Sequence, residues 1–314
     1  MRAAVLIDGR LEVRERPTPE PGPGDVLVEV HGAGVNAADL IQRRGFYPAP
    51  PGWPTDVPGL ELAGVVAAVG PGVDAGLVGR RVCAIVGGGA QATHCVVPHE
   101  HLIEVPESVD LTVAGGFAEA FITAHDALVT QAAATAADRI LISGATGGVG
   151  SAAVQIGARL GATVIAVTRT PQFHRELQQL GATQTVTLDE VATLDPVDVV
   201  LELVGAAHLQ LALTVLAPHA RVVVIGVGGG GRVEVDLRTV MSRRATITGS
   251  TLRARSREEK ALVIERATTD LLDDWSSGRL RVPIARVVDL ADVAAAYDYF
   301  AEPGKFGKVL VRTT

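Results

Sequence analysis

Hydrophobic positions between residues 139 and 225 alternate between short continuous runs and longer stretches at helical spacing. Continuous runs are typical of strands buried on both faces, and they predict strands at Ile140–Ile142, Thr163–Val167, Thr183–Thr187, Val197–Leu201 and Arg221–Ile225. Apolar residues that recur every three or four positions predict helices over residues 152–160, 171–180 and 206–216. Strands that alternate with helices indicate an α/β fold with a doubly wound parallel sheet.

The first of these strands leads into a glycine-rich turn, Gly144-Ala-Thr-Gly-Gly-Val-Gly150. Such a turn lets backbone N–H groups approach a pyrophosphate, and the N-terminus of the next helix adds positive partial charge. The spacing departs from G-x-G-x-x-G, because Ala145 stands at its first place. Within the repeat, the turn predicts a dinucleotide site with the phosphate over Gly147–Val149. The alternative is a turn that only connects a strand to a helix.

The end of the second strand bears on the choice between NADH and NADPH. A site for NADH carries an acidic residue about 20 residues after the turn, which accepts hydrogen bonds from the ribose hydroxyls. This chain has Val167-Thr-Arg-Thr170 there. Arg169 can pair with a 2′-phosphate, and Thr168 and Thr170 can donate further hydrogen bonds. These residues favour NADPH, and the alternative is an Arg169 that is simply solvated at a strand end.

Residues 1–121 have a different pattern, with short strand-like runs separated by turns. Runs at Ala3–Ile7, Leu11–Arg14, Val26–His31, Gly64–Val69, Arg81–Val86 and Thr93–Val97 predict a strand-rich, barrel-like domain. Asp8-Gly9 is a hairpin signal between the first two runs. After Arg266, a helix, a strand at Pro283–Val288, a helix at Leu290–Phe300 and a strand at Gly307–Val311 are expected to return to this domain.

A proline-rich loop over Gly45–Pro58 carries Phe46, Tyr47 and Trp53. The whole chain has only three tyrosines and two tryptophans, so the cluster is unusual. Aromatic side chains on a stiff loop predict contact with a flat ligand, and packing of the loop onto its own domain is an equal alternative.

Length and charge limit the classes of function. A chain of 314 residues exceeds one core of ordinary size, which predicts two domains. The net charge of −7, from 28 basic and 35 acidic residues, argues against nucleic acid or an anionic membrane as a partner. No run of about 18 apolar residues occurs, and Met1–Asp8 is too short for a secretory signal. We expect a cytoplasmic protein that acts on small molecules.

The cysteines and histidines give little support for a metal site. Cys83 and Cys95 lie in strand-like runs, so we expect two small buried residues rather than a disulfide or a catalytic thiol. His99 and His101 flank Glu100 in what we expect to be a surface turn with solvated histidines. A two-histidine metal site is the alternative.

Several strings of residues, spread over nearly the whole chain, carry a family resemblance. They are Val35-Asn-Ala-Ala-Asp39, Asp39-Leu-Ile-Gln-Arg-Arg-Gly45, Gly59-Leu-Glu-Leu-Ala-Gly64, Gly88-Gly-Ala-Gln91, Glu119-Ala120 with Thr123-Ala124, Gly144-Ala-Thr-Gly-Gly-Val-Gly150 and Leu252-Arg-Ala-Arg255. In them the chain resembles the medium-chain dehydrogenase/reductase superfamily, in its zinc-independent quinone oxidoreductase branch. The resemblance implies a GroES-like catalytic domain over residues 1–122, completed by 267–314, and a Rossmann-type NADPH-binding domain over residues 123–266. It also implies NADPH in the cleft between these domains, quinones as acceptors and commonly a homodimer.

The same resemblance implies candidate site residues. It places Asn36, Tyr47 and Glu119 near the nicotinamide as candidate catalytic residues. Asn36 either forms a hydrogen bond to the nicotinamide or to the acceptor carbonyl, or is only a turn residue. Tyr47 either stacks on a quinone or donates its phenolic proton. Glu119 either takes part near the nicotinamide or bridges the two domains. The residues implied along the cofactor are Thr123, Ala145, Thr146, Gly147, Gly148, Val149, Thr168, Arg169, Gly205, Gly226, Ser250, Leu252 and Lys308.

The chain departs from its zinc-dependent relatives at their ligand positions. Asn36 stands where those relatives carry a cysteine ligand, and Leu60 precedes Glu61 where they carry His-Glu. Their four-cysteine lobe is also absent. Since catalytic zinc takes three protein ligands and structural zinc four, we expect no zinc.

The sequence therefore predicts NADPH-dependent reduction of quinones or related conjugated carbonyls, such as enones, by hydride transfer. Reduction of an enoyl thioester is a second enzymatic possibility, because these compounds are also electrophilic alkenes. A non-catalytic NADPH-binding sensor or structural protein is a third, and the sequence leaves all three open.

Overall fold

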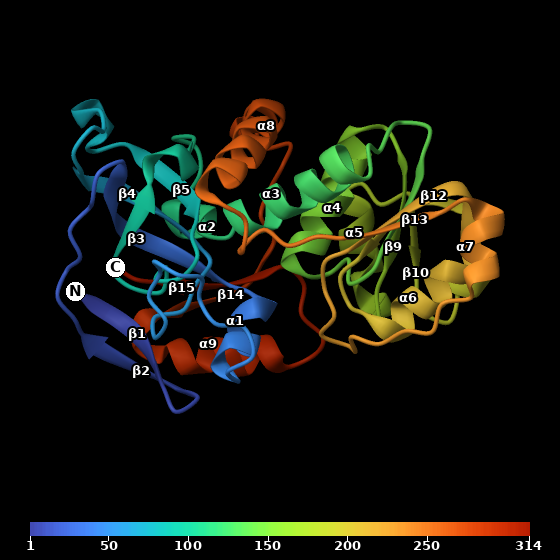
Figure 1. The fold of residues 1–314 in the computed structure, drawn as a ribbon, viewed down its shortest axis with the longest axis horizontal. Coiled ribbons are helices and arrows are strands. Elements are labelled where there is room, and N and C mark those ends of the chain that lie inside the picture. Colours follow the sequence, from blue (N-terminus) through green and yellow to red (C-terminus); the bar gives the residue numbers. More distant parts are fainter. The chain divides into compact units, whose positions relative to one another are not determined.

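The computed structural model describes residues 1–314, which divide into two compact units (Figure 1). The first unit consists of residues 1–122, 252–303 and 307–314, and the second of residues 123–251 and 304–306. The first segment of the first unit ends at Ile122. The chain returns to the first unit at Leu252 rather than at residue 267, because the last strand of the second unit ends at Gly249 and helix α8 (Arg257–Ser276) belongs to the first unit.

The second unit is built on six parallel strands in the order β10-β9-β8-β11-β12-β13. Their bounds are Arg139–Ile142 for β8, Thr163–Val167 for β9, Gln184–Val186 for β10, Val197–Glu202 for β11, Leu216–Val224 for β12 and Thr246–Gly249 for β13. From β8 the chain continues to β9 and β10 on one side, and it then crosses to β11 on the other side of β8 and continues to β12 and β13. The direction of strand addition therefore reverses between β8 and β11, which is the topological switch point of the sheet. The predicted doubly wound sheet is confirmed, and β13 is an addition to it.

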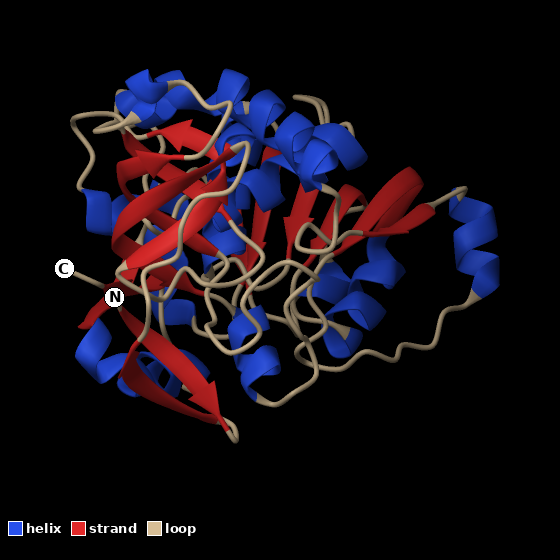
Figure 2. Ribbon diagram, turned by 60° about the vertical axis from the view of Figure 1, so that its left-hand side comes forward, coloured by secondary structure: helices blue, strands red, loops and turns tan.

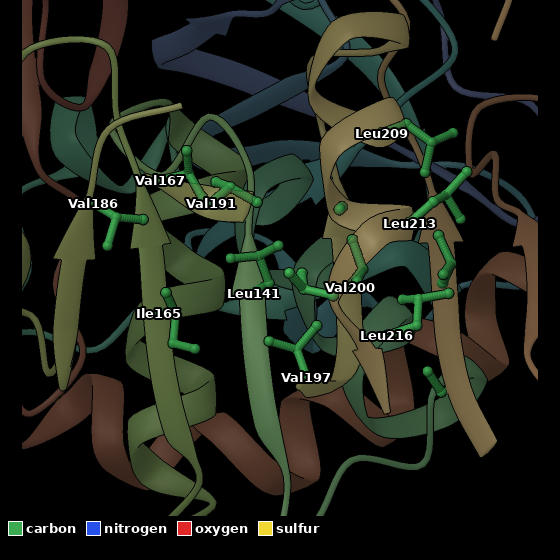
Figure 3. Close-up of a cluster of buried hydrophobic side chains, with 14 residues drawn as sticks. Leu141, Ile165, Val167, Val186, Val191, Val197, Val200, Leu209, Leu213 and Leu216 are labelled. Atoms are coloured by element: carbon green, nitrogen blue, oxygen red, sulfur yellow. The ribbon is translucent and has the colours of Figure 1, made fainter. Parts of the chain in front are cut away.

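Helices lie on both faces of this sheet (Figure 2). They are α4 (Gly148–Arg159), α5 (His174–Gln179), α6 (Ala206–Ala212) and α7 (Leu237–Arg243). On one face, Leu209 and Leu213 pack over Leu141 and Val200 from the two central strands (Figure 3). On α4, a Cβ at Gly157 would lie 2.8 Å from Val164, so glycine allows this helix to lie close to β9.

The first unit contains a sheet in the order β14-β15-β3-β4-β5-β7, in which β6 also pairs with β3. The strands are β3 (Asp25–Val35), β4 (Glu61–Val69), β5 (Arg81–Ile85), β6 (His94–Pro98), β7 (Leu102–Glu104), β14 (Ile284–Asp289) and β15 (Lys308–Arg312). A separate hairpin joins β1 (Arg2–Ile7) to β2 (Arg10–Glu15). Asp8 and Gly9 both adopt positive φ at its turn, as the predicted hairpin requires.

The helices of this unit are α1 (Ala37–Arg43), α2 (Leu111–Ala114), α8 and α9 (Val293–Ala301), and α3 (Ala118–His125) begins in it. Strand β15 follows α9 and pairs with β3, so the C-terminal segment completes the larger sheet of this unit. Cys83 and Cys95 are buried and free, as predicted. No helix has the length and apolar character needed to cross a membrane.

Candidate active site

Most of the predicted cofactor residues follow the carboxyl ends of the parallel strands in the second unit. The glycine turn follows β8, Arg169 follows β9, Gly205 follows β11, Gly226 follows β12 and Ser250 follows β13. Because these ends meet at one edge of a parallel sheet, the structure brings these residues to the edge at which such folds bind dinucleotides.

The glycine turn has the features that a pyrophosphate requires. Gly147 is the N-cap residue of helix α4, and it has no side chain that could accept a hydrogen bond from the first N–H groups of the helix. These N–H groups can therefore bind an anion. A Cβ at Gly150 would lie 2.3 Å from the carbonyl oxygen of Gly144, so only glycine lets the helix start this close to the turn. The residues present therefore fit a dinucleotide phosphate.

A buried carboxylate that the sequence did not single out shapes the neighbouring loop. One carboxylate oxygen of Glu202, at the end of β11, accepts hydrogen bonds from the Ser143 hydroxyl at 2.8 Å and from the N–H groups of Val204 and Gly205 at 2.7 Å. Gly205 adopts a φ of +119°, which disfavours any other residue. Glu202 thus holds the loop after β11 against the strand that precedes the glycine turn.

Arg169 and Thr168 occupy different environments at the end of β9. Arg169 is exposed and has no hydrogen bond or ion pair, so its guanidinium is available to a phosphate. Thr168 is 3% exposed, and its hydroxyl accepts the N–H of Thr170 at 3.1 Å. Thr168 therefore holds the turn that presents Arg169. Thr123, also assigned to the cofactor, is buried with its hydroxyl unpartnered.

In the first unit, the structure brings Asn36 and Glu119 together around Glu61. The Glu61 carboxylate is fully buried and accepts hydrogen bonds from the Asn36 amide at 3.0 Å, from the Glu119 backbone N–H at 2.9 Å and from the Lys308 ammonium. Lys308 also donates to the Asn36 side-chain oxygen at 2.7 Å. Lys308 was assigned to the cofactor from the family resemblance, and in the structure its partners are Asn36 and Glu61.

Asp39 completes this group of side chains, which we call the buried polar cluster: Asn36, Asp39, Glu61, Glu119 and Lys308. The Asp39 carboxylate accepts the backbone N–H of Asn36 at 2.8 Å and that of Gly59 at 3.1 Å. Burial raises the pKa of Asp39 to about 6. Burial, followed by the charge of Glu61, raises the pKa of Glu119 to about 8. Glu119 is therefore mostly a neutral acid at pH 7, able to donate a proton.

Tyr47 lies in the same unit, where Arg253, a residue that is 4% exposed, contacts the loop that carries it. Arg253 donates to the backbone oxygens of Gly87 at 2.7 Å and Tyr47 at 3.0 Å, and to the side-chain oxygen of Gln42 at 2.7 Å. Its guanidinium lies 4.9 Å from the centre of the Tyr47 ring. Arg253 thus fixes the loop that carries Tyr47. Leu252 beside it, which the resemblance assigns to the cofactor, is buried and belongs to the first unit.

The histidine pair differs from expectation. His101 is 1% exposed, and its Nε2–H donates to the Arg257 carbonyl at 3.0 Å, so the expected solvated histidine is wrong at this position. Helix α8 contacts the turn that carries His101, and a sequence-local pattern gives no sign of this contact. No group of three or more His, Cys, Asp or Glu side chains is arranged to hold a metal ion.

Comparisons with known proteins agree over the whole chain. A family model described as an alcohol dehydrogenase GroES-like domain matches residues 22–133, and one described as a zinc-binding dehydrogenase matches residues 148–268. The curated quinone oxidoreductase of Lama guanicoe is 31% identical over 305 residues, which cover 93% of this chain and 90% of that protein.

Two solved structures are similar in fold. The quinone oxidoreductase of Thermus thermophilus, which was also determined in complex with NADPH, matches with a TM-score of 0.87 at 31% identity and covers 100% of both chains. A cobalt- and zinc-bound alcohol dehydrogenase from Pyrobaculum aerophilum matches with a TM-score of 0.85 at 30% identity and covers 100% of this chain and 99% of its own. Since relatives with and without a metal in their descriptions share the fold, the fold alone does not decide the chemistry.

Proposed function

This chain belongs to the quinone oxidoreductase family of the medium-chain dehydrogenase/reductase superfamily, and on this premise we propose that it reduces quinones or related conjugated carbonyls with NADPH and without zinc. The observation that carries the proposal is the Lys308 ammonium, which bonds both Asn36 and Glu61. The buried Glu61 carboxylate is thereby neutralised by a protein cation rather than by a metal ion. A quinone suits such a site, because it is electron-poor enough to accept hydride without a Lewis acid.

The choice of NADPH over NADH is supported by Arg169. This guanidinium is exposed and unpaired at the end of β9, where a site for NADH would carry an acceptor for the ribose hydroxyls. The N-terminus of α4 would hold the pyrophosphate, with Gly205, Gly226 and Ser250 along the same edge of the sheet. When bound, NADPH supplies the hydride.

The buried polar cluster supplies the proton that quinone reduction also requires. Reduction of a quinone to a hydroquinone takes one hydride and one proton. We assign the proton to Glu119, whose raised pKa of about 8 keeps its carboxyl protonated at neutral pH. Asn36 donates one amide hydrogen to Glu61, which leaves its second amide hydrogen to position the acceptor carbonyl.

Steady-state NADPH oxidation against a panel of acceptors tests the proposal. The panel contains 1,4-naphthoquinone, a simple enone and a short enoyl-CoA, and we expect the highest kcat/KM with the quinone. A higher kcat/KM with the enoyl-CoA would overturn the proposal in favour of enoyl-thioester reduction. Tight NADPH binding without oxidation by any acceptor would favour a non-catalytic NADPH-binding protein.

We also propose that the protein is a homodimer. Strand β13 is the last strand of the parallel sheet and is exposed throughout, so one side of its backbone is open to pairing. Nearby on α7, Leu237 is 69% exposed and Met241 75% exposed. Apolar side chains beside an open strand edge are typical of a contact between subunits. Sedimentation analysis should give a dimer that Met241→Glu weakens, and a monomeric wild type would contradict the proposal.

A further inference from the structure

The first unit contains a cavity of about 590 Å³ that the proposed chemistry does not use. Its walls come from the proline-rich loop Gly45–Pro58, from β6 and from the start of α8. Trp53, Pro54 and Pro98 line it, so part of the wall is rigid and apolar. A cavity of this size and lining is typical of a small-molecule site.

One cation in this wall has no partner. Lys260, in the first turn of α8, is 3% exposed and lines the cavity, yet its ammonium makes no hydrogen bond or ion pair. The nearby Arg257 is already paired with Asp25 at 2.9 Å and also with Glu100. His101 also lines the cavity; burial lowers its pKa, so it is neutral at pH 7. Burial lowers the pKa of the Lys260 ammonium from its ordinary value of 10.5, and no side chain of the protein pairs with it.

The surrounding protein does not account for this charge. An unpaired ammonium in a buried position costs folding free energy, which a bound anion can recover. Glu119 acts electrostatically on Lys260, but Glu119 is itself mostly protonated at neutral pH. Glu20 and Asp25 also line the cavity, and Asp25 is paired with Arg257. A ligand carboxylate would thus meet a cation that has no ion-pair partner in the protein.

The cavity also adjoins the residues assigned to catalysis. Arg253 donates hydrogen bonds to the carbonyl oxygens of Gly87 and Tyr47. Gly88 and Gly89, which follow Gly87 in the chain, line the cavity. Lys260 lies within electrostatic reach of both Glu119 and Arg253. A ligand in the cavity would therefore extend toward the buried polar cluster.

We propose that this cavity binds the carboxylate end of an aromatic acceptor, with the carboxylate paired to Lys260 and the flat apolar part beside Trp53. A single free cation matches a monovalent carboxylate, whereas a phosphate takes several donors. The assignment of this ligand as the acceptor rests on the proposed reductase function. The binding of the carboxylate does not, so the two can be tested apart.

Calorimetric binding of 2-naphthoate and of its uncharged analogue 2-naphthamide tests the site directly. Wild-type protein should bind the naphthoate more tightly, and Lys260→Met should reduce naphthoate affinity by about 10- to 100-fold with little effect on the amide. Lys260→Arg should retain most of the preference. Arg266→Gln removes one positive charge from an exposed position of the same helix and should match wild type.

Two results would overturn the inference: no preference for the carboxylate in the wild type, or equal naphthoate affinity in wild type and Lys260→Met. Tryptophan fluorescence verifies that the Lys260→Met protein is folded. If that variant does not fold, the affinities of Lys260→Arg for naphthoate and naphthamide are compared with those of the wild type instead. Reduction of uncharged 1,4-naphthoquinone tests the enzyme separately. Naphthoate binding through Lys260 without any quinone reduction would overturn the proposed function and leave the carboxylate site standing.

Discussion

The carboxylate of Glu61 accepts a hydrogen bond from the backbone N–H of Glu119 at 2.9 Å. This contact joins β4 to the start of α3 and brings two acidic side chains into one buried region. Burial and then the Glu61 charge raise the pKa of Glu119 to about 8, while Lys308 acts in the opposite direction. The cluster therefore has a carboxyl group whose charge changes near neutral pH, and this has consequences for both stability and turnover.

We predict that stability of the first unit falls as pH rises toward 8. Glu119 binds its proton more tightly in the folded state, so its contribution is present below its ordinary value of 4.5 and lost as pH rises through about 8. The loss is at most about 1.4 kcal/mol per pH unit. Glu119→Gln should remove the Glu119 part of this decline, between about pH 4.5 and 8. The decline due to Asp39, whose pKa is raised from 3.8 to about 6, should remain in the variant.

Urea unfolding followed by tryptophan fluorescence measures this effect, because Trp53 and Trp275 both lie in the first unit. The difference in the free energy of unfolding between wild type and Glu119→Gln should change with pH between about 4.5 and 8 and be constant above that range. A difference that does not depend on pH would contradict the raised pKa of Glu119.

We predict that quinone turnover declines above pH 8, because Glu119 then loses the proton that it donates. Glu119→Gln should lower kcat by about 100-fold and remove the alkaline limb, since general acids contribute on that order or more. The exposed Glu107→Gln is the matched control and should keep the wild-type profile. An alkaline limb that persists in Glu119→Gln would assign the proton to another group.

We predict that the purified protein contains no stoichiometric zinc and keeps its activity after chelation. Asn36 and Leu60 stand where zinc-dependent relatives carry ligands, and Lys308 neutralises Glu61. Metal analysis before and after chelation measures this. A tightly bound zinc ion in each chain, with activity lost on chelation and restored by zinc, would refute zinc independence.

The parallel sheet could be predicted from the sequence because most of its strands are buried on both faces. Leu141 and Val200, for example, belong to continuous apolar runs, which are distinctive over only four or five residues. Strand β13 could not be predicted in this way, because Thr246–Gly249 is exposed and shows no apolar pattern. Its strand conformation depends on pairing with β12.

The glycine turn could be predicted because its conformation depends on seven neighbouring residues, Gly144 to Gly150. The roles of Arg253 and Lys308 could not, because their partners are distant in the sequence: Arg253 contacts Tyr47 across 206 residues and Lys308 contacts Asn36 across 272. The sequence indicates the structural role of Glu202 only weakly, through the position of a carboxylate at the end of an apolar run. Such side chains are identified only when the fold brings their partners together.

We predict that Arg169→Ala weakens NADPH binding by about 10- to 100-fold and leaves NADH binding nearly unchanged. The exposed guanidinium has no protein partner to lose, so the effect should come from the 2′-phosphate, and a charged hydrogen bond contributes about 1.5–3 kcal/mol. Fluorescence titration with each cofactor measures the two affinities. Equal losses for NADPH and NADH would show that Arg169 does not read the 2′-phosphate.

The Tyr47 ring is held from one side by Arg253, whose guanidinium lies 4.9 Å from the ring centre. The Tyr47 side chain is half-buried, and the hypothesis that it stacks on a flat quinone assigns that contact to its ring. If Tyr47 instead donates its phenolic proton, the hydroxyl rather than the ring carries the effect. Two substitutions separate these roles, because phenylalanine keeps the ring and alanine removes it.

We predict that Tyr47→Phe keeps most of the quinone turnover, whereas Tyr47→Ala loses about 1 kcal/mol or more of transition-state stabilisation, or about fivefold or more in kcat/KM. Phe46→Ala should behave as wild type. Steady-state kinetics, with NADPH affinity measured separately, distinguish the roles: if Phe were nearly as poor as Ala and the alkaline limb were lost, Tyr47 would be a proton donor. Unchanged kinetics in both Tyr47 variants would remove this residue from the acceptor site.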